Sequence, residues 1–152
     1  MNDRIALAVM IFAIAMTAVT NADAPQERAL ALSFEESTLQ WGPCPDFMPK
    51  SCQLAVLHGD PTQKNADVFL KVPGDTALPH HWHSSAERMI LVSGQLEVQY
   101  DGQPARQLKP GMYAYGPAKL GHTGKCAKGD PCVLFIAFEA PIDAMPSAAK
   151  AK

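Results

Sequence analysis

The 152-residue sequence has no cluster of basic residues and no acidic tail. Its 13 Lys and Arg residues nearly balance its 15 Asp and Glu residues, and the formal net charge is −2. Because nucleic-acid-binding domains carry a basic patch or stripe, this balance argues against nucleic acid as a partner. The sequence also lacks internal repeats and low-complexity tracts, so its length predicts a single domain.

Charged residues are missing from residues 5–19, which are apolar except for Thr17. A short start with one arginine precedes this run, and Ala-Asp-Ala at residues 22–24 follows it. This is the layout of a secretory signal, and the run is short for a membrane span of about 20 residues. We therefore predict a signal peptide over residues 1–24. The protein is then periplasmic or secreted, with no membrane attachment after cleavage; an uncleaved anchor is the alternative.

Cysteine is scarce and is absent from the first 43 residues, so a lipid-anchored N-terminus has no support. A twin arginine is also missing there, so export in the folded state has no support either. The four cysteines are Cys44, Cys52, Cys126 and Cys132. An even number in an exported chain favours disulfides, and the local spacings are not the C-x2-C of zinc sites. The most local of the three pairings joins Cys44 to Cys52 and Cys126 to Cys132. A zinc site or buried free thiols are the alternatives.

Thirteen prolines and ten glycines indicate many turns rather than long helices. Residues 25–52 have no regular pattern, whereas short apolar segments alternate with turn signals from Gln53 onward. The expected strands are residues 53–58, 66–72, 87–94, 95–100, 105–108, 112–116 and 133–138. Short strands at this spacing predict an all-β sandwich or barrel over residues 53–143. We expect a flexible tail at residues 144–152.

The stretch HHWHSSAE, residues 80–87, concentrates three histidines and a glutamate before an apolar run. If the chain stays extended here, His81, His83 and Glu87 share one face, whereas His80 points away. Buried imidazoles and a buried carboxylate are costly without a partner. A divalent ion such as Fe, Mn, Co, Ni, Cu or Zn suits this ligand set.

A further ligand must come from elsewhere in the chain, where His58 and His122 are the other histidines. His122 follows an expected strand, so a loop could bring it over one end of a barrel. The alternative is that residues 80–87 form a polar loop, with Ser84 and Ser85 in a turn.

The first of two motifs resembles that of the cupin superfamily, which runs glycine, five residues, H-x-H, three or four residues, Glu, six residues and Gly. Here Gly74 is followed by DTALPH, by HWH at residues 81–83, by SSA, by Glu87, by RMILVS and by Gly94. The match is complete except for one extra residue after Gly74.

The second cupin motif runs glycine, five residues, Pro-x-Gly, two residues, His, three residues and Asn. Gly111, Pro117 and His122 keep its spacing. The inner glycine falls at position 121 instead of 119, and Cys126 occupies the asparagine position. The stretch PHHWHSSAERMILVSGQLEV is especially similar to small, single-domain, exported bacterial cupins.

This resemblance implies a small jelly-roll β-barrel with a metal near one open end. It implies the ligands His81, His83, Glu87 and His122 around a divalent transition metal: Fe, Mn, Cu, Zn or Ni. An exported chain acquires its metal outside the cytoplasm, where the Irving–Williams order favours Cu and Zn. Many cupins pair as dimers, so a homodimer is consistent with the resemblance.

The expected pocket walls are Met89, Leu91, Leu96, Val98 and Tyr100, together with one face of residues 133–138. Such walls suit a small, partly aromatic or enolisable substrate. Arg88 and Lys71 are the nearest candidates for binding an anion, although the parity of Arg88 favours the outer face. We predict a dioxygenase-like, metal-dependent enzyme that acts on a small molecule. The alternatives are a metal-dependent lyase or isomerase and a non-catalytic periplasmic cupin that binds a metal or a small ligand.

Overall fold

The structure, a computed structural model, describes residues 27–147. The expected signal segment and the end of the expected tail lie outside these residues. The chain divides into two units, residues 1–31 and residues 32–152. In the first unit, residues 27–31 are exposed and have no regular secondary structure. Residues 27–147 contain no helix with the length and hydrophobicity needed to cross a bilayer.

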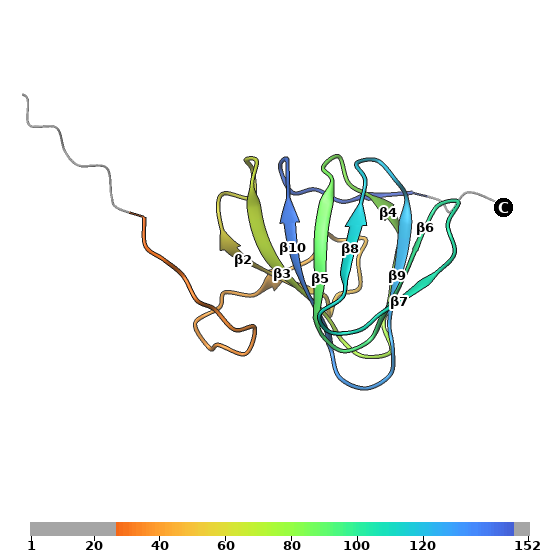
Figure 1. Ribbon diagram of the computed structural model, residues 1–152, viewed down its shortest axis with the longest axis horizontal. Coiled ribbons are helices and arrows are strands. Elements are labelled where there is room, and N and C mark those ends of the chain that lie inside the picture. Colours follow the sequence, from red (N-terminus) through yellow and green to blue (C-terminus); the bar gives the residue numbers. More distant parts are fainter. Residues whose placement is uncertain (1–26, 148–152) are drawn as a thin grey trace, which may run out of the picture. The chain divides into compact units, whose positions relative to one another are not determined.

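Within the described part of the second unit, antiparallel strands form two sheets. The six-stranded sheet has the order β1 (Gly42–Pro43), β2 (Gln53–His58), β3 (Ala66–Val72), β10 (Cys132–Phe138), β5 (Glu87–Ser93) and β8 (Tyr113–Gly116). The five-stranded sheet has the order β11 (Met145–Pro146), β4 (Ala77–Trp82), β9 (His122–Cys126), β6 (Leu96–Tyr100) and β7 (Arg106–Leu108). Figure 1 shows β10, β5 and β8 side by side.

The all-β jelly-roll prediction is confirmed, and the reason is visible in the alternation of side chains along the strands. On β5, Glu87, Met89 and Leu91 are buried, whereas Arg88 and Ile90 are exposed. The same alternation runs along β6. Because successive side chains of a strand point to opposite faces, each sheet presents one apolar face to the core.

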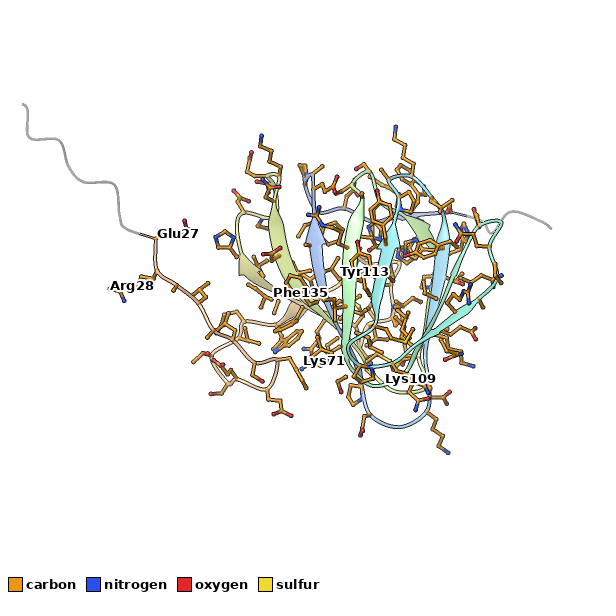
Figure 2. All side chains as sticks on the ribbon, viewed as in Figure 1. Glu27, Arg28, Lys71, Lys109, Tyr113 and Phe135 are labelled. Atoms are coloured by element: carbon orange, nitrogen blue, oxygen red, sulfur yellow. A yellow bond between two sulfur atoms is a disulfide. The ribbon has the colours of Figure 1, made fainter. Side chains whose placement is uncertain are left out.

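The outer face of the six-stranded sheet carries apolar side chains of its own. Phe135 pairs with Phe69 on β3 and with Ile90 on β5, and Ile90 pairs with Tyr113 on β8. Phe135 and Tyr113 can be found on this face in Figure 2. The inward-facing side chains of the same strands are thus available to line the cavity described below.

Two short strands extend the fold beyond residues 53–143. In β1, Gly42 pairs with Leu54 of β2. In β11, Met145 and Pro146 pair with the end of β4, and the Ser147 N–H donates to the His80 carbonyl oxygen at 3.1 Å. Residues 145–146, within the expected tail, thus form a short strand that pairs with the edge of β4.

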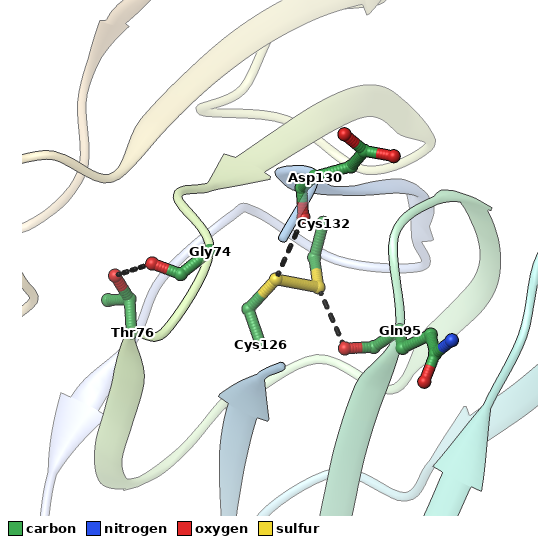
Figure 3. The surroundings of a disulfide bond; sticks show 6 residues. All are labelled: Gly74, Thr76, Gln95, Cys126, Asp130 and Cys132. Atoms are coloured by element: carbon green, nitrogen blue, oxygen red, sulfur yellow. Dashed lines mark hydrogen bonds between the residues drawn. A yellow bond between two sulfur atoms is a disulfide. The ribbon is translucent and has the colours of Figure 1, made fainter. Parts of the chain in front are cut away.

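Both disulfides of the most local pairing are present, with Cα–Cα distances of 5.5 Å for Cys44–Cys52 and 5.7 Å for Cys126–Cys132. The second bridge joins the last residue of β9 to the first residue of β10, and so connects the two sheets. Figure 3 shows its surroundings, where Cys132 Sγ lies 3.1 Å from the Gln95 carbonyl oxygen. Neither sulfur pair belongs to a metal site.

Removing the Cys126–Cys132 bridge should destabilise the protein, because the bridge restricts the unfolded chain and ties the two sheets together. We expect the double variant C126A/C132A to lose roughly 2 kcal/mol of unfolding free energy, the size expected for so short a loop. Urea denaturation of the oxidised proteins measures this loss. Equal stability of the oxidised variant and the oxidised wild type would contradict the expectation.

Candidate metal centre

Three buried histidines converge at one end of the five-stranded sheet. His81 lies in β4 and pairs directly with His122, the first residue of β9, while His83 follows the end of β4. One ring nitrogen of each histidine lies within 4.8 Å of those of the other two. This group could hold a metal ion.

The ring nitrogens of these histidines have separate roles. The Nδ1 atom of His81 lies 2.7 Å from the Pro79 carbonyl oxygen, and that of His122 lies 3.3 Å from the Leu120 carbonyl oxygen. The Nδ1 atom of His83 bonds to the carbonyl oxygen of Asp143. Because a carbonyl oxygen only accepts, each Nδ1 must carry the proton. In the neutral ring, Nε2 then keeps a free lone pair for a metal, and the carbonyl fixes the orientation of the ring.

Glu87 reaches the same place from the other sheet, as the first residue of β5. Its Oε2 lies 3.6 Å from His83 Nε2, and its Oε1 lies 3.4 Å from His122 Nε2. Donor atoms about 2 Å from one transition-metal ion are separated by roughly 3–4 Å, which matches these distances. Glu87 is 2% exposed, and its Oε1 atom has no hydrogen-bond partner.

Burial sets the protonation of these groups. It lowers the pKa of His81 to about 3, with the neighbouring His122 adding to the effect. It lowers the pKa of His122 to about 4, with His83 adding to the effect. Burial raises the pKa of Glu87, and the nearby His83 opposes this only in part. The two imidazoles are therefore neutral, as a metal requires, and the buried carboxylate is without a compensating cation.

The donor set thus fits a divalent transition metal, since imidazole and carboxylate together suit Fe, Mn, Co, Ni, Cu and Zn. An ion would satisfy three lone pairs and an orphaned carboxylate oxygen at once. The sequence-based grouping of His81, His83, Glu87 and His122 is what the structure brings together.

The path that brings Glu87 to the histidines differs from the one extended strand that we expect. The chain bends at Ser84 and Ser85, so that β4 and β5 belong to different sheets. The bend is held from the C-terminal side, where Ser85 Oγ accepts the N–H groups of Glu139 and Ala140, each at 2.9 Å. The serine turn that was the alternative to a metal site is therefore present, and it serves to carry the chain across the site.

His80 points away from the histidine group, as its parity predicts. Its Nε2 lies 2.8 Å from Asp101 Oδ1, and its Nδ1 lies 2.8 Å from Ser147 Oγ. The ring packs so closely on Gly121 that a Cβ there would lie 2.5 Å from His80 Cε1. The displaced inner glycine of the second motif thus has a packing role in this chain.

A cavity of about 130 Å³ extends from the histidines and Glu87 into the barrel. Of the expected pocket residues, Met89, Leu96 and Val98 line it. Leu91 and Tyr100 do not: Leu91 is fully buried in the core. The other apolar lining residues include Leu54, Leu70, Leu78, Leu134, Ile136 and Phe138.

Tyr100 instead packs behind His122, with ring centroids 5.2 Å apart, and its buried hydroxyl has no hydrogen-bond partner. A Cβ on Gly116 would lie 2.6 Å from Glu87 Oε1 and 3.0 Å from this hydroxyl. Gly116, the last residue of β8, therefore leaves room for the Glu87 carboxylate and the Tyr100 hydroxyl.

Several cavity residues lie outside the sequence-based set. Met48 and the Cys44–Cys52 bridge form part of the lining from the N-terminal segment, and residues 142–144 form part of it from the C-terminal segment. In the sequence, the spacing of Cys44 and Cys52 was the available signal for the N-terminal lining residues. For Asp143, which bonds to His83 across 60 residues of sequence, no local pattern exists.

Arg88 and Lys71 do not face the cavity. Arg88 Nη1 lies 2.8 Å from Glu139 Oε1 in an exposed ion pair, and Lys71 Nζ lies 3.9 Å from the centre of the Trp41 ring. Their long side chains cover the outer surface, as the parity of Arg88 predicts.

The pKa shifts predict how the stability of the metal-free protein depends on pH. His81 and His122 stay neutral in the folded state but gain protons in the unfolded state below about pH 6.5, so the free energy of unfolding falls as pH drops from 6.5 toward 4. The raised pKa of Glu87 opposes this, because only the unfolded state loses that proton near pH 4.5. E87Q removes this opposition and should steepen the fall between pH 6.5 and 4.5. Urea denaturation with a chelator present measures it, and a shallower dependence in E87Q would contradict the assignment.

Comparisons with known proteins identify the fold. A family model described as a cupin domain matches residues 68–138. A comparison with curated proteins found no match.

Solved structures similar to the chain include a DMSP lyase, DddQ from Ruegeria pomeroyi DSS-3, with 17% identity, a TM-score of 0.64, and coverage of 75% of this chain and 64% of that chain. The polyketide cyclase RemF from Streptomyces resistomycificus has 14% identity, a TM-score of 0.64, and coverage of 80% and 88%. KdgF from Halomonas sp. has 20% identity, a TM-score of 0.55, and coverage of 68% and 89%. The chain spans less than two thirds of the DMSP lyase chains that it matches. At these identities the likeness shows the fold, and the family match shows that residues 68–138 of this chain form a cupin domain.

Proposed function

We propose that this protein is a metal-dependent enzyme that acts on a small molecule, with chemistry of the dioxygenase type. Its ligands would be His81, His83, His122 and Glu87. The observation that carries this proposal is that three ring nitrogens with free lone pairs meet a buried carboxylate at the end of an apolar cavity.

The cavity distinguishes this site from a purely structural one. Structural zinc sites are closed by four protein ligands, whereas catalytic sites keep a position open for water or substrate. Four ligands leave one or two positions in a five- or six-coordinate ion, and the cavity leads to the ligands. A bound divalent ion would supply Lewis acidity and an oriented coordination position. The chain itself positions the ligands and surrounds the substrate with walls that exclude water.

The lining also bears on the type of reaction. Among the described residues, the cavity has no Lys, Arg, Ser, Thr or Tyr in its walls. The Asp143 carboxylate, which does line it, accepts hydrogen bonds from the Ser84 N–H at 2.8 Å and from the Ser84 hydroxyl. Without an independent base or nucleophile, proton-transfer chemistry by side chains has little support, and chemistry centred on the metal is favoured.

Non-catalytic binding of a small ligand is the second candidate, because the same scarcity of acid–base groups fits it. Structural neighbours do not choose between the two, since their names include a lyase, a cyclase and an oxalate decarboxylase. A metal-dependent lyase or isomerase remains the further alternative. The two disulfides support a location in an oxidising compartment, the periplasm or the exterior.

Metal binding is the first test. H83A should lower the affinity for a divalent metal by at least about tenfold, because losing a direct ligand costs more than losing an outer hydrogen-bond partner. The matched control is H58A, which removes an imidazole at the exposed end of β2. Competition with a chromophoric chelator measures the affinity. Full affinity in H83A, or an equal loss in H58A, would contradict the ligand assignment.

Catalysis is the second test, made on protein purified from its native compartment with its metal content measured. Oxygen uptake is followed with catechols, β-diketones and hydroxy acids as candidate substrates. The proposal predicts uptake with at least one class, and its loss in H83A. If every class perturbs the spectrum of the bound metal but none consumes oxygen, the oxygenase proposal is wrong and the binding protein is favoured.

A further inference from the structure

We infer that the substrate of this site has a metal-binding end and an otherwise uncharged, apolar body about the size of a six-carbon ring. This inference rests on the proposed function, because it takes the metal to hold the donor end. It goes further by defining the part of the molecule that the chain itself must recognise.

The walls beyond the ligands are hydrocarbon. Leu78, Leu96 and Val98 come from the five-stranded sheet, and Leu134, Ile136 and Phe138 come from β10 of the other sheet. No Lys or Arg among residues 27–147 lines the cavity. A second anionic group on the substrate would therefore be buried without a cation, which is among the most costly arrangements in a protein.

A cationic body would meet only carboxylates that already have partners. Among residues 27–147, the charged side chains of the lining besides the histidines are Glu87 and Asp143. Glu87 faces the imidazoles of His83 and His122, and the Asp143 carboxylate is occupied by two hydrogen bonds from Ser84. Among residues 27–147, Phe138 is the one benzene ring in the lining, and it lies edge-on against His83, so these residues form no aromatic cage of the kind that recognises quaternary ammonium groups.

The size of the cavity sets the size of the body. An apolar protein cavity of about 150 Å³ accepts benzene, and the volume here is about 130 Å³. Its N-terminal wall is fixed, because the Met48 N–H donates to the Pro45 carbonyl oxygen at 2.9 Å inside the loop closed by Cys44–Cys52. A larger body would have to displace this loop.

Three isosteric carboxylates test the inference: 4,4-dimethylpentanoate, 3-(trimethylammonio)propanoate and 3-sulfopropanoate. They share a two-carbon linker and a compact branched end. That end is neutral in the first probe, cationic in the second and anionic in the third. The probes are titrated into the full, cobalt-loaded mature protein, after its cobalt content has been measured. Changes in the visible cobalt spectrum report binding without requiring turnover.

The probe with the neutral end, 4,4-dimethylpentanoate, should bind at least tenfold more tightly than either probe with a charged end. V98T, which places a hydroxyl in the wall at unchanged volume, should weaken the neutral probe several-fold, whereas V56T at an exposed position of β2 should not. Equal or tighter binding of a charged probe would overturn the inference, and so would the failure of all three to bind a fully cobalt-loaded protein. Failure to load cobalt would instead refute the proposed metal site, and the two failures are therefore distinct.

Discussion

The site depends on one constraint. Each of three buried imidazoles has two ring nitrogens, and the fold provides a hydrogen-bond partner for only one of them, Nδ1. The carbonyl oxygens of Pro79, Leu120 and Asp143 accept from the Nδ1 side. The opposite nitrogens of His83 and His122 face Glu87, whose Oε1 has no hydrogen-bond partner in the described chain. The neutral rings of His81 and His122, held in a fixed orientation near an uncompensated carboxylate, are stable together with it when a cation lies between them.

The rest of the fold serves this arrangement. The bend at Ser84 and Ser85 carries the chain from one sheet to the other, so that Glu87 meets the histidines across the end of the barrel. The C-terminal segment holds that bend through Ser85 and supplies the Asp143 carbonyl, and the Cys44–Cys52 loop closes the cavity from the N-terminal side. Two segments distant in sequence therefore shape the space in which a substrate would lie.

Much of this was accessible from the sequence, because period-two alternation and turn residues are local signals and the cupin motifs have fixed spacing. The strands, the local disulfides and the grouping of His81, His83, Glu87 and His122 follow from them. Parity alone places Leu91 and Tyr100 on the pocket side, and parity gives a face but not the position of a cavity along it. Asp143 and Met48 could not be found, because their contacts join segments that no local pattern relates.

The tautomers of His81 and His122 test the central claim most directly. Long-range nitrogen–proton NMR correlations of the metal-free protein at pH 7 distinguish a protonated from an unprotonated Nε2. Both rings should be neutral with the proton on Nδ1, because burial lowers the pKa of each and a carbonyl oxygen accepts from each Nδ1. Adding one equivalent of zinc should then shift both Nε2 resonances. A proton on Nε2 in either ring, or Nε2 signals that zinc leaves unchanged, would contradict the account.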